Sequence, residues 1–214
     1  MKFPFFASFI ILCLVVRHAI NRGNKLQEKS ETAFWNEESA ANNTRKQSLD
    51  SLNYVTFSAA PLLPDTLLDS SFCKTLMEDS QIRKIEEHLK ALEQKRIVNL
   101  NYITNTELKA TYGVGNLSIL TEYDQNYTDL ITLLNEYASL LADKGCTAPA
   151  LTVLETAFAI QTDISASYSL AASIYRAQGQ ADKIEQLVQQ AEKLNSPRKN
   201  AIVRMLRTTD PDNG

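Results

Sequence analysis

The side chains that most often carry chemistry are few in this chain and far apart. There are only two histidines, His18 and His88, which is too few for a histidine-rich metal site. The three cysteines form no C-x-x-C pair, so their spacing indicates neither a zinc site nor a disulfide framework; they are Cys13, Cys73 and Cys146. We therefore expect no metal and no cofactor.

Two short patterns have part of an active-site signature but lack the rest. Glu86 and Glu87 are neighbours on an expected helix, so they point in different directions and cannot flank one bond. The sequence GVG at 113–115 lacks the other glycines and the preceding strand of a nucleotide-binding loop. These observations favour a protein that is not an enzyme, with an enzyme of unrecognised site as an alternative.

The composition describes an ordinary globular chain with no charge signature. Its 214 residues allow one or two small domains, and 44% hydrophobic residues suffice for a packed core. The net charge is -3, so the chain lacks the clustered cations that nucleic acid requires. We expect no nucleic acid partner.

The chain opens with an apolar segment. Residues 3–16 read FPFFASFIILCLVV, which is apolar except for Ser8. A signal peptide would be followed by a cleavage site of small residues, but Arg17 and His18 come next. Ala19 and Ile20 extend the segment toward the roughly 20 residues of a membrane span. We predict an uncleaved transmembrane anchor over residues 1–20.

The charges beside this segment predict its orientation. Lys2 and the amino terminus lie before it, and more cations follow it: Arg17, Arg22, Lys25 and Lys29. The positive-inside rule then places the soluble part in the cytoplasm, where reduced cysteines are expected. The alternative is an exported protein with a cleaved or reversed signal. N-x-S/T matches would matter only there; they fall at Asn42, Asn116 and Asn126.

Residues 21–53 are polar and lack proline, which predicts a helical stalk. Residues 54–78 are expected to be a linker, because Pro61 and Pro64 break helices. Residues 79–125 form the helical or mixed first part of the folded domain. There Asp79 or Ser80 can cap a helix whose apolar stripe is Ile82, Ile85, Leu89 and Leu92.

Residues 96–116 combine apolar residues, a helix-capping pattern and two glycines. Four of its apolar residues are expected to be buried: Ile97, Val98, Leu100 and Tyr102. Thr104 and Glu107 match the S/T-x-x-E capping box. Gly113 should end the short helix that follows, because glycine takes the left-handed conformation at little cost.

A repeat with an offset of 34 residues follows. Gly145 aligns with Gly179, and five further pairs keep the same offset: Ala138 with Ala172, Leu141 with Tyr175, Ala150 with Ile184, Leu154 with Val188, and Ala157 with Ala191. Each copy reads as a helix, a turn at glycine and a second helix. Small residues let paired helices approach closely, and the glycine allows the turn.

This pattern resembles the tetratricopeptide repeat, whose period is 34 residues. The second copy departs from it at Ile184 and the first at Leu141. The resemblance implies an all-α solenoid with a concave groove for a protein or peptide partner. By position in the pattern, the groove residues are Thr132, Asn135, Ser139, Asp143, Ser169, Ser173 and Arg176, with Ala142, Ala166 and Ala177 beside them.

The resemblance also implies repeat-packing residues: Ala138, Gly145, Ala150, Ala157, Ala172, Tyr175, Gly179 and Ala191. Ser196 and Pro197 should start a capping helix, so that the repeats and this helix cover residues 126–207, with a disordered tail at 208–214. Members of the family that bind a C-terminal carboxylate use several lysines and arginines in the groove. Arg176 alone does not meet that requirement. The expected function is a membrane-anchored, non-enzymatic adaptor; the alternative is envelope assembly by an exported protein.

Overall fold

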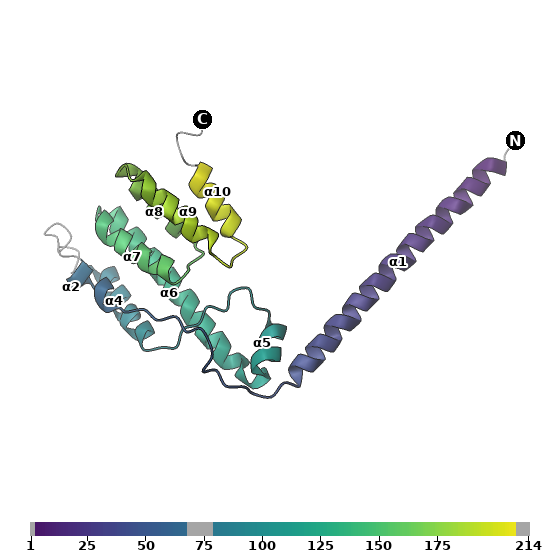
Figure 1. Cartoon of the computed structure of the whole chain (residues 1–214), viewed down its shortest axis with the longest axis horizontal. Helices are drawn as coiled ribbons and strands as arrows, with labels where there is room; N and C mark the ends of the chain where they lie inside the picture. The colour runs from purple at the N-terminus through teal and green to yellow at the C-terminus, as the bar shows by residue number, and fades with distance from the viewer. Residues whose placement is uncertain (1–2, 68–78, 209–214) are drawn as a thin grey trace. The chain divides into compact units, whose positions relative to one another are not determined.

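The computed structural model describes the backbone of residues 3–67 and 79–208 and the side chains of residues 15–63, 66–67 and 79–208. Within these residues the chain is helical, apart from loops and one isolated antiparallel bridge between Tyr54 and Val98 (Figure 1). The all-α class predicted from the sequence is confirmed. The predicted tail beyond Thr208 lies outside the described residues.

The chain forms two compact units. Unit 1 comprises Met1–Leu49 with Thr104–Leu117, and unit 2 comprises Asp50–Ile103 with Ser118–Gly214. Each unit therefore combines two segments that are distant in the sequence. They are described separately below.

Unit 1 begins with the long helix α1 (Phe3–Asn42). Its side chains are exposed from Val15 to Glu37, and the helix ends at Asn42, before residue 53, where the predicted helical stalk ends. In the part of the chain that the structure describes, no helix is long and apolar enough to cross a membrane. The apolar side chains of residues 3–14, on which the predicted anchor rests, lie outside that part.

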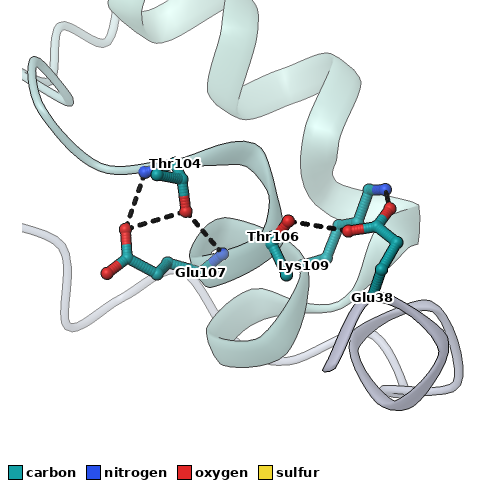
Figure 2. A network of polar contacts seen from close by, with 5 residues as sticks. All are labelled: Glu38, Thr104, Thr106, Glu107 and Lys109. Atoms are coloured by element: carbon teal, nitrogen blue, oxygen red, sulfur yellow. Dashed lines mark hydrogen bonds and ion pairs between the residues drawn. The ribbon is translucent and has the colours of Figure 1, made fainter. Parts of the chain in front are cut away.

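The end of α1 contacts the short helix α5 (Asn105–Tyr112). The predicted capping box is confirmed: the Glu107 amide donates to Thr104 Oγ1 at 3.2 Å, and Glu107 Oε2 accepts from the Thr104 amide at 2.7 Å (Figure 2). Glu38 of α1 accepts a hydrogen bond from Thr106 and pairs with Lys109. The bond from Lys109 holds the pKa of Glu38 below its usual value.

Gly113 ends α5 as predicted, with a φ of 82°. Its position is crowded, because a Cβ here would lie 2.4 Å from the carbonyl oxygen of Arg45. The helical turn η3 (Val114–Asn116) follows, and the side-chain Nδ2 of the buried Asn116 donates to the carbonyls of Gln47 and Tyr112 at 2.8 and 2.7 Å. Backbone contacts thus fasten the end of the stalk to the segment around α5.

Unit 2 begins with two short helices where the sequence predicted a linker. Pro61 lies in the first turn of η1 (Ala60–Leu62), and Pro64 opens α2 (Pro64–Leu67). Proline is favourable in a first helical turn, because the missing amide hydrogen has no partner there anyway. Ala59 and Leu62 are buried in the core, so this stretch is part of the folded unit. The rest of the predicted linker, 68–78, lies outside the described residues.

Helix α4 (Ser80–Glu93) follows the sequence prediction. Asp79 caps it by accepting from the Gln81 amide, and the predicted stripe is buried: Ile82, Ile85, Leu89 and Leu92. Asp79 also pairs with Lys144 at 3.0 Å, and the bond from Lys144 lowers the pKa of Asp79. This pair joins the start of α4 to the end of α6 (Leu117–Asp143).

The segment after α4 is extended along α6. The Val98 amide donates to the Tyr123 carbonyl at 3.3 Å, and the Leu100 amide donates to Asp124 at 3.0 Å. Ile97, Val98 and Leu100 are buried as predicted. The expectation for Tyr102 is wrong: this side chain is 45% exposed. Its φ is 75°, a left-handed conformation in which the chain changes direction after Leu100.

Five successive helices complete unit 2: α6, α7 (Thr147–Ala159), α8 (Ser165–Ala177), α9 (Ala181–Glu192) and α10 (Lys199–Thr208). One hydrophobic core runs through them and includes three fully buried tyrosines, Tyr127, Tyr137 and Tyr168. Helix α10 begins at Lys199, later than predicted, because residues 196–198 form a turn in which the Arg198 amide donates to Ser196 Oγ.

Candidate functional site

The residues expected to pack the repeats lie between helices. All five alanines are at most 1% exposed: Ala138, Ala150, Ala157, Ala172 and Ala191. Tyr175 is also buried, and its hydroxyl reaches Glu155 of α7 at 3.5 Å. Gly145 and Gly179 separate α6 from α7 and α8 from α9, with φ values of 80° and 68°. The chain therefore consists here of two consecutive helix–turn–helix units.

Three helices in this region end in the same hydrogen-bond pattern. After α6, the Cys146 amide donates to the Leu141 carbonyl and the Gly145 amide to that of Ala142. The ends of α8 and α7 repeat these two bonds, with Gly179 and Gln161 in the place of Gly145. This is the Schellman arrangement, which requires a left-handed residue after the helix. Gln161 meets the requirement without being glycine, with a φ of 62°.

The predicted groove residues lie on α6 and α8, and they differ in exposure. Four are exposed: Thr132, Asp143, Ser169 and Ser173. Asn135, Ser139 and Arg176 are partly buried. The exposed members offer short polar side chains to a partner.

Asn135 takes part in a contact between the two helix pairs. Its Oδ1 accepts from Ser167 Oγ at 2.9 Å, which joins α6 to α8. Ser139 Oγ donates to the Asn135 carbonyl at 2.9 Å. The Nδ2 of Asn135 is left for a further hydrogen bond, so its position is fixed while one donor stays available.

Arg176 is also held by the fold. Its guanidinium donates to the carbonyl of Leu206 at 3.2 Å, near the end of α10. A cation near the end of a helix is favourable because the carbonyl dipoles point toward it. Its Nε is buried without a hydrogen-bond partner in the described part of the chain. Arg176 thus contacts α10 through Nη2, and its Nε has no hydrogen-bond partner among the described residues.

Tyrosine hydroxyls hold residues 160–163, which connect the two helix pairs of unit 2. Tyr127 donates to the carbonyls of Ile160 and Gln161 at 3.2 and 3.0 Å, and Tyr168 donates to the carbonyl of Thr162 at 3.1 Å. Burial raises the pKa of Tyr127 and of Tyr168 far above the usual value, so both remain protonated donors.

The fourth residue of this connection, Asp163, is 8% exposed. Its Oδ2 accepts from the hydroxyl of Tyr102 and, at 3.0 Å, from Ser196 Oγ. Burial and the bond to Asp163 raise the pKa of Tyr102. Sequence patterns do not predict this cluster, because its members come from three distant segments. A motif search finds residues that are close in sequence, and none of these are.

Cys146, at the turn between α6 and α7, is disulfide-bonded. The expectation of reduced cysteines is therefore wrong for this residue. The spacing of the cysteines did not predict it, because a single bridge between distant positions leaves no local pattern. The side chains of Cys13 and Cys73 lie outside the described residues.

Two of the three N-x-S/T asparagines are unsuitable as modification sites in the folded chain. Asn116 and Asn126 are buried, and the side-chain Nδ2 of Asn126 donates to the Arg96 carbonyl at 3.0 Å. Over the described ranges, 3–67 and 79–208, no three or more His, Cys, Asp or Glu side chains lie in an arrangement that could hold a metal ion.

Comparison with protein-family models, with curated protein sequences and with solved structures finds no match for this chain.

Proposed function

We propose that this protein is a non-enzymatic adaptor that binds a protein partner through tetratricopeptide-like helix pairs and is held at a membrane by residues 3–20. The observation that carries the proposal is the pair of consecutive helix–turn–helix units, each with a left-handed glycine and fully buried alanines at equivalent places. Such pairs stack into a solenoid that offers the first helix of each unit to a partner.

The surface of these first helices supports the proposal. Ser169 and Ser173 are exposed on α8, and Thr132 is exposed on α6. Short side chains leave room for a bound segment. Asn135 is already fixed by Ser167, so it would donate to a partner without first losing rotational freedom.

The side of the membrane is a separate part of the proposal. The cations after residue 16 favour the cytoplasm. The disulfide of Cys146 favours the alternative, an exported module that serves envelope assembly, because disulfides are rare in reducing compartments. These two features favour opposite sides of the membrane.

Site-specific photo-cross-linking in cells tests the adaptor proposal. A photoreactive amino acid at Ser169 or Ser173 should capture the same protein, and one at Gln189, exposed on the second helix α9, should not. Equal capture from Gln189 and Ser173 would contradict a groove on the first helices. No capture from any groove position would remove the support for an adaptor.

Thiol labelling tests the side of the membrane. Cells are treated with a membrane-impermeant alkylating reagent, before or after a brief reduction, and the mass of the peptide containing Cys146 is measured. An exported domain should be labelled only after reduction. Labelling that requires lysis of the cells would place the domain in the cytoplasm.

A further inference from the structure

A small polar pocket lies in unit 2, beside the connection between the two helix pairs. Its volume is about 150 Å³, and Asp163, Tyr102 and Ser196 contribute to its wall. Four further side chains around it carry carboxamides for which the structure records no hydrogen bond: Asn53, Asn101, Gln161 and Asn195. The pocket is therefore surrounded by hydrogen-bonding groups that the fold itself does not use.

The wall of the pocket carries a negative charge, and no ion pair among the described residues offsets it. Asp163 is hydrogen-bonded to two neutral hydroxyls and is absent from the ion pairs of the described residues. Among the described residues, no lysine, arginine or histidine contributes to the wall. Arg198 is near enough to Tyr102 to act on its pKa but makes no ion pair with Asp163. A buried carboxylate without a cation is costly unless a partner supplies the charge.

The backbone around the pocket is strained. Tyr102 and Gln161 are the two non-glycine residues of the described chain with positive φ, and both contribute to this pocket. Such conformations are unfavourable for residues with a side chain and persist where the surrounding structure imposes them, often at binding sites. Here Tyr127 donates to the Gln161 carbonyl and so holds one of the two.

We propose that this pocket receives a basic side chain, an arginine, of the protein partner. A guanidinium has five N–H donors and no acceptor, so it matches a carboxylate surrounded by carboxamide oxygens. Its charge offsets that of Asp163, and its plane can lie against the exposed ring of Tyr102. The volume suits a single side chain, since pockets for larger ligands begin at about 300 Å³.

This assignment rests on the proposed adaptor function, because it names the chemistry of the partner. An anionic ligand is disfavoured, since the wall includes the carboxylate of Asp163 and, over the described residues, no cationic side chain. A neutral sugar would satisfy the carboxamides but would leave the charge of Asp163 without a counter-ion. A guanidinium supplies both the positive charge and several donors for the carboxamide oxygens, and its five donors exceed the three of an ammonium.

The experiment uses the full chain in mild detergent and ligand-observed magnetic resonance, which detects weak binding. The probes are N-acetyl-arginine amide and N-acetyl-citrulline amide, which have the same shape but differ in charge. We expect the arginine probe to bind at least tenfold more tightly. Equal binding of the two, or no binding of either, would overturn the proposal.

Variants connect this difference to the pocket. Asp163→Asn should reduce binding of the arginine probe at least tenfold, and Asp182→Asn, the same change at an exposed position on α9, should have no effect. Should Asp163→Asn fail to fold, Asn195→Asp provides a second test. It adds a carboxylate at the exposed rim and should strengthen binding several-fold; unchanged or weaker binding there would count against the pocket.

Two further probes separate the alternatives. Free L-arginine that binds far more tightly than the blocked probe would overturn the assignment to a partner chain. Binding of N-acetylglucosamine in preference to the arginine probe would show a neutral ligand and overturn the charge argument. Cross-linking from Ser173 with no response to the arginine probe would leave the adaptor in place and remove only the pocket.

Discussion

The turns inside the two helix pairs and the connection between the pairs share one backbone geometry but differ in residue type. Inside the pairs, the left-handed position is glycine, at Gly145 and Gly179. Between the pairs it is Gln161, and the nearby Tyr102 also has a positive φ. Glycine is used where the chain only has to reverse. A side chain is kept, at a cost in strain, where it surrounds a polar pocket.

The largest effect is expected at Gly113, the glycine with the least space around it. Its φ of 82° and ψ of 148° lie close to a region that only glycine adopts, and an added Cβ would meet the Arg45 carbonyl oxygen. Gly113→Ala should destabilise unit 1 by more than about 3 kcal/mol. Hydrogen exchange of the Gln47 amide, which donates to the Tyr112 carbonyl, measures this loss.

Gly115→Ala is the control for Gly113→Ala. A Cβ at Gly115 would lie 3.7 Å from side-chain atoms of Lys46, an ordinary contact. This variant should keep the protection of the Gln47 amide. Similar losses in both variants would contradict the assignment of the effect to Gly113.

The second largest effect is expected at Gly179, which tests the cost of left-handed geometry alone. Its φ is 68°, and nothing lies within 4 Å of an added Cβ. Gly179→Ala should therefore lower the free energy of unfolding by about 1–2 kcal/mol, the cost of the left-handed conformation. Chemical denaturation measures it. Gly23→Ala, also unhindered but inside α1, should instead increase helicity.

A smaller effect is expected for the hydroxyl that holds the connection. Tyr127→Phe removes the donor to two carbonyls and should cost about 1 kcal/mol. Tyr137→Phe is the matched control, because the Tyr137 hydroxyl is buried without a partner among the described residues. That change should cost nothing or stabilise. A larger loss for Tyr137→Phe than for Tyr127→Phe in chemical denaturation would contradict this account.

The smallest effect on stability is expected at Gln161. Gln161→Gly relieves the left-handed strain but increases the entropy of the unfolded chain, so the two changes should cancel to within about 1 kcal/mol. Binding of the arginine probe should nevertheless weaken, because one carboxamide is lost. A variant that gains stability and keeps full binding would show that Gln161 serves only the turn.

The sequence predicted those parts of the fold that depend on neighbouring residues. The capping box at Thr104, the cap at Asp79 and the glycine turns follow local rules, and the structure confirms them. The end of α7 was not foreseen as the same turn, because Gln161 does not have the residue type that the rule requires. Tyr102 is apolar like its buried neighbours, but its backbone is left-handed and its side chain is 45% exposed, which residue type alone does not indicate.

The candidate sites divide in the same way. The positions on α6 and α8 could be named from the repeat, since a helix fixes which residues share a face. The hydrogen bonds of Arg176 to Leu206 and of Asn135 to Ser167 depend on how distant helices pack, and no spacing rule gives them. The Asp163 cluster and the disulfide of Cys146 require long-range proximity as well.

The tyrosine-held connection has a kinetic consequence. Because three hydroxyls already fix residues 160–163, a ligand would meet a surface that needs no rearrangement before docking. Association should then proceed at the rate usual for rigid partners, about 10⁵–10⁷ M⁻¹s⁻¹. Differences in affinity between partners would then lie mainly in their dissociation rates.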